Sequence, residues 1–448
     1  MQRTETLIIG GGLAGLSAAV TLSRGGRAFE LIEATDQVGG RVRTDTIDGF
    51  QLDRGFQVLL TAYPTCRQLL DYQSLDLRRF EPGALIRTGG RWHRLGDPWR
   101  RPTTTWSTLI NPAGSLLDKL RIAKVRHAAC KGALSDVYHR PDMPTIDYLR
   151  QCGFSERMID RFFRPFLGGV YLEPELRTSR RMFDFVFRMF ANGDVAVPSA
   201  GMQAIPNQLA QTAGNDRIHR RTTAVAVDGD TVRLSDGRQI MADNIIVATT
   251  ANDAAALFPS LRSDTAPTDS IPTDSVSTDW NQTLNLNFAV AKGVGRSDHI
   301  AAGRTLLLRG DEPDGIQTAT ILSGVASTYA PQDQHLVSCS FPVAKDQDVA
   351  EVSIDRKIDA AKSQLSDWLK LAPGDLRFVR AYPIRYGLPS RPLQPVQQPI
   401  DPACLQNAAP DCPAVYLVGD HRATPSIEGA MSTGQSAAAA ILRRPVNQ

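Results

Sequence analysis

Three glycines near the start of the chain have the spacing that binds a dinucleotide phosphate. Gly10, Gly12 and Gly15 follow the apolar residues 6–9 in the order G-x-G-x-x-G. The first glycine of such a loop permits a sharp turn, the second lets a pyrophosphate approach the backbone, and the third lets the next helix pack closely on the strand. The phosphate then lies on free N–H groups at the helix start. The spacing predicts a strand, a phosphate-binding turn and a helix over 14–22.

A carboxylate follows the glycines at the distance that ribose recognition requires. Residues 28–32 form a second apolar run, which ends at Glu33, about 20 residues after the loop. Its oxygens are suited to bind ribose hydroxyls, and an acid here favours a ribose without a phosphate. This motif leaves NAD and FAD both open.

A second glycine-rich segment distinguishes the two cofactors. Residues 38–44 read VGGRVRT and residues 52–58 read LDRGFQV. The forked guanidinium of Arg41 is suited to a pyrophosphate in a larger dinucleotide that continues past the first crevice. Here the sequence resembles the flavin-containing amine oxidase superfamily, whose members carry a GGR-x-x-T stretch at this point. The resemblance implies FAD.

The C-terminal segment 414–442 forms another strand, loop and helix. The strand ends at Gly419 and Asp420, where ligands bind in open α/β sheets, and the carboxylate is suited to a ribityl hydroxyl. Glu428, Gly429 and Ala430 are expected to begin a helix whose free N–H groups face the flavin pyrimidine edge and stabilise reduced flavin. The pattern S-x-E-G-A-x-x-S/T-G resembles the same superfamily.

The middle of the chain is expected to contribute a third piece. Residues 224–250 alternate apolar and polar types around two Asp-Gly turns and close with the apolar run 245–248, which predicts a β-meander returning to a parallel sheet. The resemblance implies a backbone contact from Val225 to adenine and an Ala-Thr-Gly turn. This chain has Thr250 where that glycine is expected.

The candidate site residues follow from these segments. The expected cofactor contacts are Gly10, Gly12, Leu13, Ala14, Gly15, Glu33, Ala34, Gly39, Gly40, Arg41, Gly55, Phe56, Val225, Gly419, Asp420, Ile427, Glu428, Gly429 and Ala430. The candidate catalytic residues are His421, the histidine inside a flavin motif, Gln57 after the second motif, and Tyr382 and Tyr386, expected on a cavity floor. Residues 386–388 resemble the site where some amine oxidases tether their flavin. They contain no cysteine, so the resemblance implies non-covalent FAD.

We therefore expect an α/β fold with two domains. A discontinuous Rossmann-like FAD-binding domain of the GR2 type comprises residues 1–90, 196–256 and 404–448. A substrate-binding domain comprises 91–195, mostly helical, and 257–403, with a mixed antiparallel sheet. Residues 259–283, which repeat PTDS, are expected to form a flexible loop.

Composition excludes several classes of protein. A net charge of +3 over 448 residues argues against a nucleic-acid partner. The sequence contains no run of about 18 uncharged apolar residues, so no membrane span is predicted. Because the N-terminus enters the fold at once, a cytoplasmic protein is expected. Six cysteines without a C-x-x-C pair, and no histidine at ligand spacing, predict neither a metal site nor disulfides.

Residues 78–140 combine many arginines with Trp92, Trp99 and Trp106 and an amphipathic helical pattern. This combination is typical of a segment that lies on an anionic bilayer surface, so peripheral membrane contact is one interpretation. The alternative is a cap over the substrate domain with a solvated basic face and its tryptophans tucked inside.

The remaining segments bear on the substrate. Residues 161–190 are rich in Phe and Met and predict helical core that also lines part of an apolar cavity. Together with the P-x-x-G-M-x-x-I-P-x-x-L stretch at 198–209 they resemble protoporphyrinogen oxidases and phytoene-type desaturases. The expected function is an FAD-dependent oxidase or desaturase that removes hydride from a bulky apolar substrate of isoprenoid or porphyrinogen type.

Two further points define this expectation. Only one G-x-G-x-x-G is present, so oxygen or a quinone is the expected electron acceptor rather than a nicotinamide. The alternatives are a flavin amine oxidase and a non-catalytic binder of lipidated partners, since Rab GDP-dissociation inhibitors share the architecture.

Overall fold

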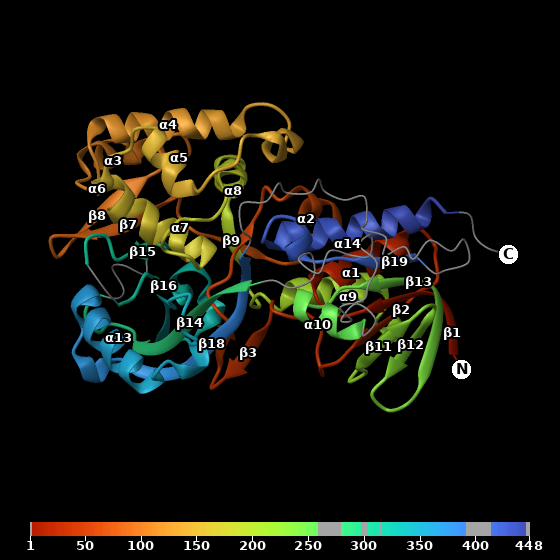
Figure 1. Ribbon diagram of the computed structural model, residues 1–448. Helices are drawn as coiled ribbons and strands as arrows, with labels where there is room; N and C mark the ends of the chain where they lie inside the picture. Colours follow the sequence, from red (N-terminus) through yellow and green to blue (C-terminus); the bar gives the residue numbers. More distant parts are fainter. Residues whose placement is uncertain (1, 259–278, 297–302, 313–314, 391–413, 445–448) are drawn as a thin grey trace.

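The computed structural model describes residues 2–258, 279–296, 303–312, 315–390 and 414–444 (Figure 1). Residues 259–278 of the expected loop and 404–413 of the expected cofactor domain lie outside the described residues. The expected α/β class is confirmed, with two seven-stranded sheets and helices on both.

The first sheet brings together segments from the beginning, middle and end of the chain. Its order is β10-β2-β1-β13-β12-β11, with β19 also paired to β13. The strands are β1 (Gln2–Ile9), β2 (Glu30–Glu33), β10 (Ile218–Arg220), β11 (Ala224–Asp228), β12 (Thr231–Leu234), β13 (Gln239–Val247) and β19 (Ala414–Leu417). β10, β2, β1, β13 and β19 run parallel, and β12 and β11 form the expected meander.

Two helices from opposite ends of the sequence pack together on this sheet. They are α1 (Leu13–Arg24) and α14 (Ile427–Leu442), drawn in red and blue in Figure 1. A Cβ on Gly434 would lie 1.9 Å from the carbonyl oxygen of Ala14, so only glycine permits this approach. Helices α2 (Pro64–Leu69), α9 (Ala204–Ala213) and α10 (Ala251–Leu257) complete this half.

The second sheet has the order β18-β14-β17-β16-β15-β7-β8 and is antiparallel except between β15 and β7. Its strands are β7 (Gly83–Thr88), β8 (Arg91–Gly96), β14 (Asp279–Ala291), β15 (Leu306–Leu308), β16 (Thr318–Ile321), β17 (Gln334–Pro342) and β18 (Arg377–Ser390). Helix α13 (Ile354–Leu369) packs against it through Leu365, Trp368 and Leu369.

Two of the expected boundaries need correction. The cut at residue 90 falls inside the β7–β8 hairpin, and because β7 pairs with β15, residues 83–88 group with the second sheet. The expected loop 259–283 ends too late, since residues 279–283 belong to β14. There Asn281 and Thr283 are buried; Asn281 pairs with β18, and Thr283 pairs with both β18 and β17, which supply the pairing that the repeat-like sequence does not reveal.

A helical lobe connects β8 to the short strand β9 (Val195–Pro198), which pairs with β5 (Leu59–Leu60) and β6 (Leu77–Arg79). Its helices are α3 (Thr105–Ile110), α4 (Leu116–Cys130), α5 (Thr145–Gln151), α6 (Glu156–Met158), α7 (Arg164–Tyr171) and α8 (Arg180–Asn192). A two-stranded hairpin, β3 (Thr44–Ile47) and β4 (Phe50–Asp53), follows the second glycine segment.

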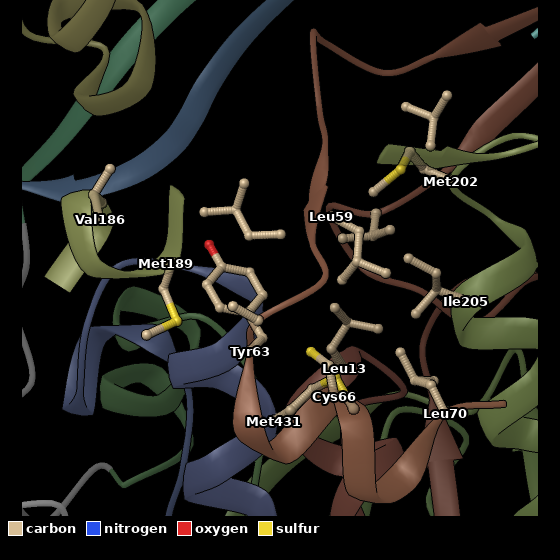
Figure 2. Close-up of a cluster of buried hydrophobic side chains, with 14 of the residues drawn as sticks. Leu13, Leu59, Tyr63, Cys66, Leu70, Val186, Met189, Met202, Ile205 and Met431 are labelled. Carbon is tan, nitrogen blue, oxygen red and sulfur yellow. The ribbon is translucent and has the colours of Figure 1, made fainter. Parts of the chain in front are cut away.

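The largest core joins the helical lobe to the first sheet. Figure 2 shows Leu13 of α1, Val186 and Met189 of α8, and Met431 of α14, which belong to one cluster of buried hydrophobic side chains. Tyr63 stacks on Phe185 with ring centroids 6.0 Å apart. The Phe- and Met-rich segment 161–190 is therefore largely core, as expected.

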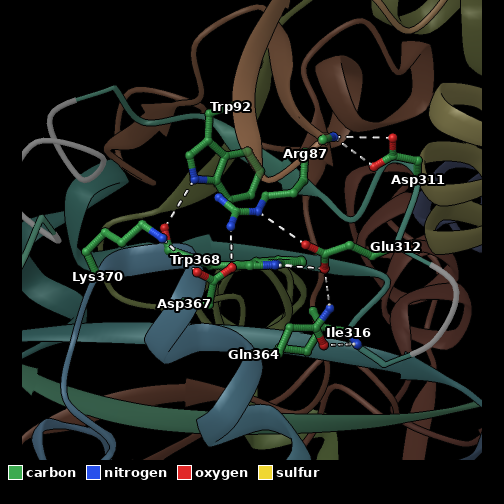
Figure 3. Close-up of polar contacts among 10 residues, drawn as sticks. Arg87, Trp92, Asp311, Glu312, Ile316, Gln364, Asp367, Trp368 and Lys370 are labelled. Carbon is green, nitrogen blue, oxygen red and sulfur yellow. Dashed lines mark hydrogen bonds and ion pairs between the residues drawn. The ribbon is translucent and has the colours of Figure 1, made fainter.

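A buried ionic network fixes α13 on the second sheet (Figure 3). The Arg87 guanidinium on β7 donates to Glu312 at 3.2 Å and also to Asp367. Glu312 in turn accepts from the indole N–H of Trp368 at 2.9 Å and from Gln364 at 2.8 Å. The Arg87 side chain is only 3% exposed, so these acids compensate a charge that burial would otherwise penalise.

Candidate functional site

The first glycine loop has the geometry that a close ligand requires. Gly10 has φ +107°, and a Cβ on Gly15 would lie 2.0 Å from the Gly10 carbonyl oxygen, so both positions need glycine for the chain's own packing. Gly12 differs, because a Cβ there would meet nothing within 4 Å. The second glycine of the motif therefore faces open space, which a pyrophosphate would need in order to approach the backbone there.

The second glycine segment lies directly against the first. Gly12 and Gly39 form a parallel bridge, and the Gly39 N–H donates to the Gly11 carbonyl at 2.8 Å. Gly40 has φ +58°, and a Cβ on it would meet only the Gly12 Cα, at 3.3 Å. Gly12 and Gly40 thus form one open cradle from two sequence motifs.

Both carboxylate oxygens of Glu33 accept hydrogen bonds from the protein, one of them from the glycine loop. One carboxylate oxygen accepts from the Gly11 N–H at 2.7 Å, and the other accepts from the N–H and the hydroxyl of Thr35 at 2.9 and 2.7 Å. The residue is buried, at the end of β2. Glu33 therefore stabilises the glycine loop, in addition to the ribose contact that remains a prediction.

Arg41 connects the cofactor segments to the second sheet. Its guanidinium donates to Asp420 at 2.5 Å and to the Gly387 carbonyl of β18 at 2.9 Å, and it lies 5.1 Å from the Trp280 ring centroid. Two expected cofactor residues from opposite ends of the chain are thus brought together. Sequence reasoning missed Trp280, because the PTDS repeat beside it masked the start of β14.

Gln57 lies beside Arg41, and only the NH₂ group of its side-chain amide forms hydrogen bonds. Its NH₂ group donates to the carbonyls of Arg41 at 2.8 Å and of Arg54 at 3.1 Å. Its Oε1 is buried and has no partner among the described residues. A buried acceptor without a donor is unfavourable, so this atom fits a bound group that presents an N–H or O–H.

The neighbours of Gln57 pack outward from the site. Gly55 has φ +97°, and a Cβ on it would lie 2.5 Å from Ile384 on β18. Phe56 makes an edge contact with Phe80 at 6.2 Å.

The middle segment places its expected residues at the edge of the sheet. Val225 is 46% exposed on the edge strand β11, beside a bulge between Ala224 and Ala226. Its contact with adenine remains a prediction. Thr250 does not need to be glycine, because its φ is −62° and its hydroxyl caps α10 by accepting from the Asp253 N–H at 3.2 Å.

The start of α14 contradicts the expectation that the N–H groups of Gly429 and Ala430 are free to face a flavin. The Gly429 N–H donates to the Ser426 hydroxyl at 3.0 Å and the Ala430 N–H to the Ser426 carbonyl at 3.0 Å, so neither N–H is free. Ser426 is an N-cap, which satisfies these donors within the chain. The helix begins at Ile427, so the N–H groups of Ile427 and Glu428 come before those of Gly429 and Ala430 in its first turn.

Glu428 contacts another helix. Its carboxylate accepts from the backbone N–H groups of Thr65 at 2.9 Å and Cys66 at 3.3 Å, at the first turn of α2. Burial raises the pKa of Glu428, and the hydrogen bonds from Thr65 and Cys66 oppose that shift. No pattern in the sequence pairs Glu428 with α2, so this contact was missed.

The catalytic candidates are held by the protein itself. The Tyr382 hydroxyl donates to Asp45 at 2.8 Å, and Arg54 binds the same carboxylate at 2.8 Å. Burial raises the pKa of Tyr382. Tyr386 is 42% exposed and makes an edge contact with Trp280. His421 is buried, with its ring against Gly419.

A cavity of about 720 Å³ opens beside the loop between Asp420 and α14. Ala423, Thr424 and Pro425 form one wall, and residues of α5, α7 and α8 form much of the rest. β18 reaches it with Pro389 and Ser390 rather than with either candidate tyrosine.

The lining of this cavity differs from the expected apolar chamber. It contains five basic and four acidic side chains, namely Arg150, Arg164, Arg177, Arg181, Lys345, Asp147, Glu173, Glu175 and Asp279. Of the Phe and Met residues in 161–190, only Met182 lines it, because the others are turned into the core.

Three comparisons place the chain among known proteins. A profile of the family described as flavin containing amine oxidoreductase matches residues 13–442. Coproporphyrinogen III oxidase of Propionibacterium freudenreichii is 27% identical over 171 residues, 37% of this chain and 31% of that protein. The 4,4'-diapolycopene oxygenase of Methylomonas is 47% identical over 55 residues, 12% of this chain and 11% of that protein. The chain thus spans a third or less of these relatives.

The fold itself has solved counterparts. A putrescine oxidase bound to putrescine superposes with a TM-score of 0.72 at 17% identity, covering 99% of this chain and 99% of that one. At this identity the match concerns the fold. No helix among the described residues is long and apolar enough to cross a membrane.

Proposed function

This chain belongs to the flavin-containing amine oxidoreductase family, and from that premise we propose that it is an FAD-dependent oxidase or desaturase that removes hydride from a bulky substrate. The observation that carries the proposal is the convergence of three motifs. Gly12 bridges Gly39, and Arg41 pairs with Asp420. One ligand can therefore contact segments from both ends of the chain.

The residues present fit FAD in particular. The open cradle of Gly12 and Gly40 would hold the pyrophosphate, and Asp420 would accept from a ribityl hydroxyl. The unpartnered Oε1 of Gln57 would accept from a ring N–H. Bound FAD supplies a hydride acceptor at its ring nitrogen. Because residues 386–388 contain no cysteine, we propose that the cofactor is held non-covalently.

The charged cavity narrows the substrate class. A relative named coproporphyrinogen III oxidase and one named diapolycopene oxygenase represent the two expected classes, tetrapyrrole precursors and carotenoids. Arg177, Arg181 and Lys345 line the cavity together with four acids, and Arg150 is already paired with Glu156. A lining with this many charged groups suits a ligand that carries polar groups such as carboxylates better than a pure hydrocarbon. We therefore favour a porphyrinogen-type substrate, with oxygen or a quinone as the electron acceptor.

The catalytic candidates Tyr382 and His421 do not line this cavity. The Tyr382 hydroxyl donates to Asp45 and burial raises the pKa of this hydroxyl, so it is not poised as a general base in this arrangement. Hydride loss from an activated carbon depends on holding the C–H bond against the acceptor in a site that excludes water.

The test begins with the purified full chain. We expect flavin absorbance at about 450 nm and release of all flavin into the supernatant after acid precipitation. Under anaerobic conditions coproporphyrinogen should bleach the flavin, whereas a phytoene-type carotenoid and a panel of amines should bleach it more slowly. Faster bleaching by an amine would favour the amine oxidase alternative. Colourless protein that takes up no added flavin would contradict the proposal and favour a binding role.

A further inference from the structure

Most of the exposed large apolar side chains among the described residues lie in one stretch of the chain. Of nine such side chains among the described residues, seven lie within 22 residues: Trp99, Trp106, Leu109 and Ile110 before and in α3, and Leu116, Leu117 and Leu120 in α4. We call these seven the apolar platform. Trp106 is 72% exposed, the highest value of the nine. Such a concentration on a folded surface marks an interaction site.

The platform is held in place by buried polar contacts at the turn between α3 and α4. The Asp118 carboxylate accepts from the backbone N–H groups of Ser115 at 2.8 Å and Ser155 at 2.9 Å, and from both hydroxyls. Burial opposes ionisation, yet these hydrogen bonds hold the pKa of Asp118 at about 2. The first turn of α4, with its exposed leucines, is therefore anchored to α6.

Lys119 joins the two helices. Its ammonium group donates to the carbonyls of Leu109 at 2.6 Å and Asn111 at 2.8 Å, at the C-terminal end of α3. A cation there satisfies carbonyl groups that have no partner within the helix. The exposed side chains thus lie on a cross-linked pair of helices rather than on a frayed end, so their exposure is a built feature.

The sequence around the platform is rich in basic residues, although Arg100 pairs with Asp194 and Arg101 with Glu81. Residues 99–135 contain seven basic residues, Arg100, Arg101, Lys119, Arg121, Lys124, Arg126 and Lys131, and a single acid, Asp118, which is buried. The Arg126 guanidinium lies 4.8 Å from the Trp99 ring centroid. The interpretation that places the tryptophans inside is therefore wrong for Trp99 and Trp106, which are 52% and 72% exposed.

We propose that the apolar platform binds the surface of an anionic bilayer. Trp106 and the leucines enter the headgroup and upper acyl region, while the exposed Lys124 meets lipid phosphates. A protein partner is less suited, because protein interfaces are depleted in lysine and this stretch contains Lys119, Lys124 and Lys131. In Figure 1, α3 and α4 lie at the outer edge of the helical lobe, away from both termini. The proposal does not depend on the chemistry proposed above.

The experiment uses the full-length holoprotein and flotation with vesicles. Vesicles of phosphatidylcholine with phosphatidylglycerol should bind the protein, vesicles of phosphatidylcholine alone should bind it weakly, and added salt should release it. The double variant Ile110→Ser, Leu117→Ser should bind about a hundredfold more weakly, roughly tenfold for each side chain. Lys124→Glu should weaken binding about fivefold per unit charge, whereas Arg356→Glu on the exposed surface of α13 should not change it.

Two further readouts locate the contact. Brominated lipids should quench tryptophan fluorescence in the parent protein and much less in Trp106→Phe. The double variant should keep the thermal midpoint of the parent, because its substituted side chains are exposed. Failure of the parent to bind anionic vesicles, or equal binding by the double variant, would overturn the proposal. So would a parent protein that is oligomeric by light scattering, does not bind vesicles and becomes monomeric in the double variant.

Discussion

Arg41 and Asp420 are 379 residues apart in the sequence and form an ion pair with 2.5 Å between Nη2 and Oδ1. The Asp420 side chain is 5% exposed and that of Arg41 is 36% exposed. The pair therefore joins the second glycine segment to the loop before α14, and it does so at the place where the proposed cofactor would lie.

Removing Arg41 and removing Asp420 should lower the free energy of unfolding by different amounts. Arg41→Met leaves a buried carboxylate without its cation and should lower the free energy of unfolding by about 2 kcal/mol, less than for a fully buried pair because water reaches Arg41. Asp420→Asn leaves only the more exposed cation and should cost less. Urea unfolding of the two single variants and the double variant measures the coupling. Equal costs would show that burial does not govern the pair.

Gly12 and Gly15 should separate cofactor binding from folding. A side chain on Gly12 meets open space, so Gly12→Val should fold with a thermal midpoint near that of the flavin-free parent and contain no flavin. Gly15→Ala places a Cβ 2.0 Å from the Gly10 carbonyl oxygen and should destabilise the fold itself. Flavin content and thermal unfolding of both variants check this. Yellow Gly12→Val protein would contradict the assigned cradle.

Asp53 should make stability depend on pH. It is fully buried, and burial raises its pKa to about 6, although hydrogen bonds from Thr44, Met202 and Tyr329 oppose the shift. Because the folded state then holds a proton that the unfolded state has released, stability should fall as pH rises from about 4 to about 6, by about 3 kcal/mol in all.

Asp53→Asn isolates this contribution, because the amide cannot ionise and Asn can still accept from Tyr329. Urea unfolding at a series of pH values should show the parent losing stability relative to the variant across that window. A difference between parent and variant that does not change with pH would mean that Asp53 is not protonated in the folded protein.

Arg87 should be a stability residue with no role in flavin binding. Arg87→Met removes a cation whose side chain is 3% exposed and leaves Glu312 and Asp367 without it. Because both acids are partly exposed, we expect a cost of about 3 kcal/mol, at the lower end for buried pairs. Arg356→Met on the solvent side of α13 is the matched control and should cost little. Loss of flavin from folded Arg87→Met protein would contradict this assignment.

The sequence predicted those features that depend on short stretches of backbone. The glycine spacing before α1 predicted a strand, turn and helix, and β1 and α1 confirm them. The meander predicted at 224–250 corresponds to β11–β13. These patterns are local, because periodicity and glycine placement reflect the conformation of neighbouring residues.

The start of β14 could not be predicted in the same way. Residues 279–283 have no strand pattern of their own and are paired because β18 lies beside them, with β17 joining only at Thr283. Trp280 on this strand then covers Arg41, a contact that depends on how the two sheets meet. The pairing of Glu428 with α2 has the same origin.

The sequence by itself predicted that segments from the two ends of the chain bind one dinucleotide, because a close backbone approach and an open strand end require particular residues at fixed spacings. Only the tertiary structure decided that Gly12 alone of its three glycines faces open space, that nine charged side chains line the cavity, and that Trp99 and Trp106 of the helical lobe are exposed. These features depend on which side chains are brought together by packing over long sequence distances, and no local pattern encodes that.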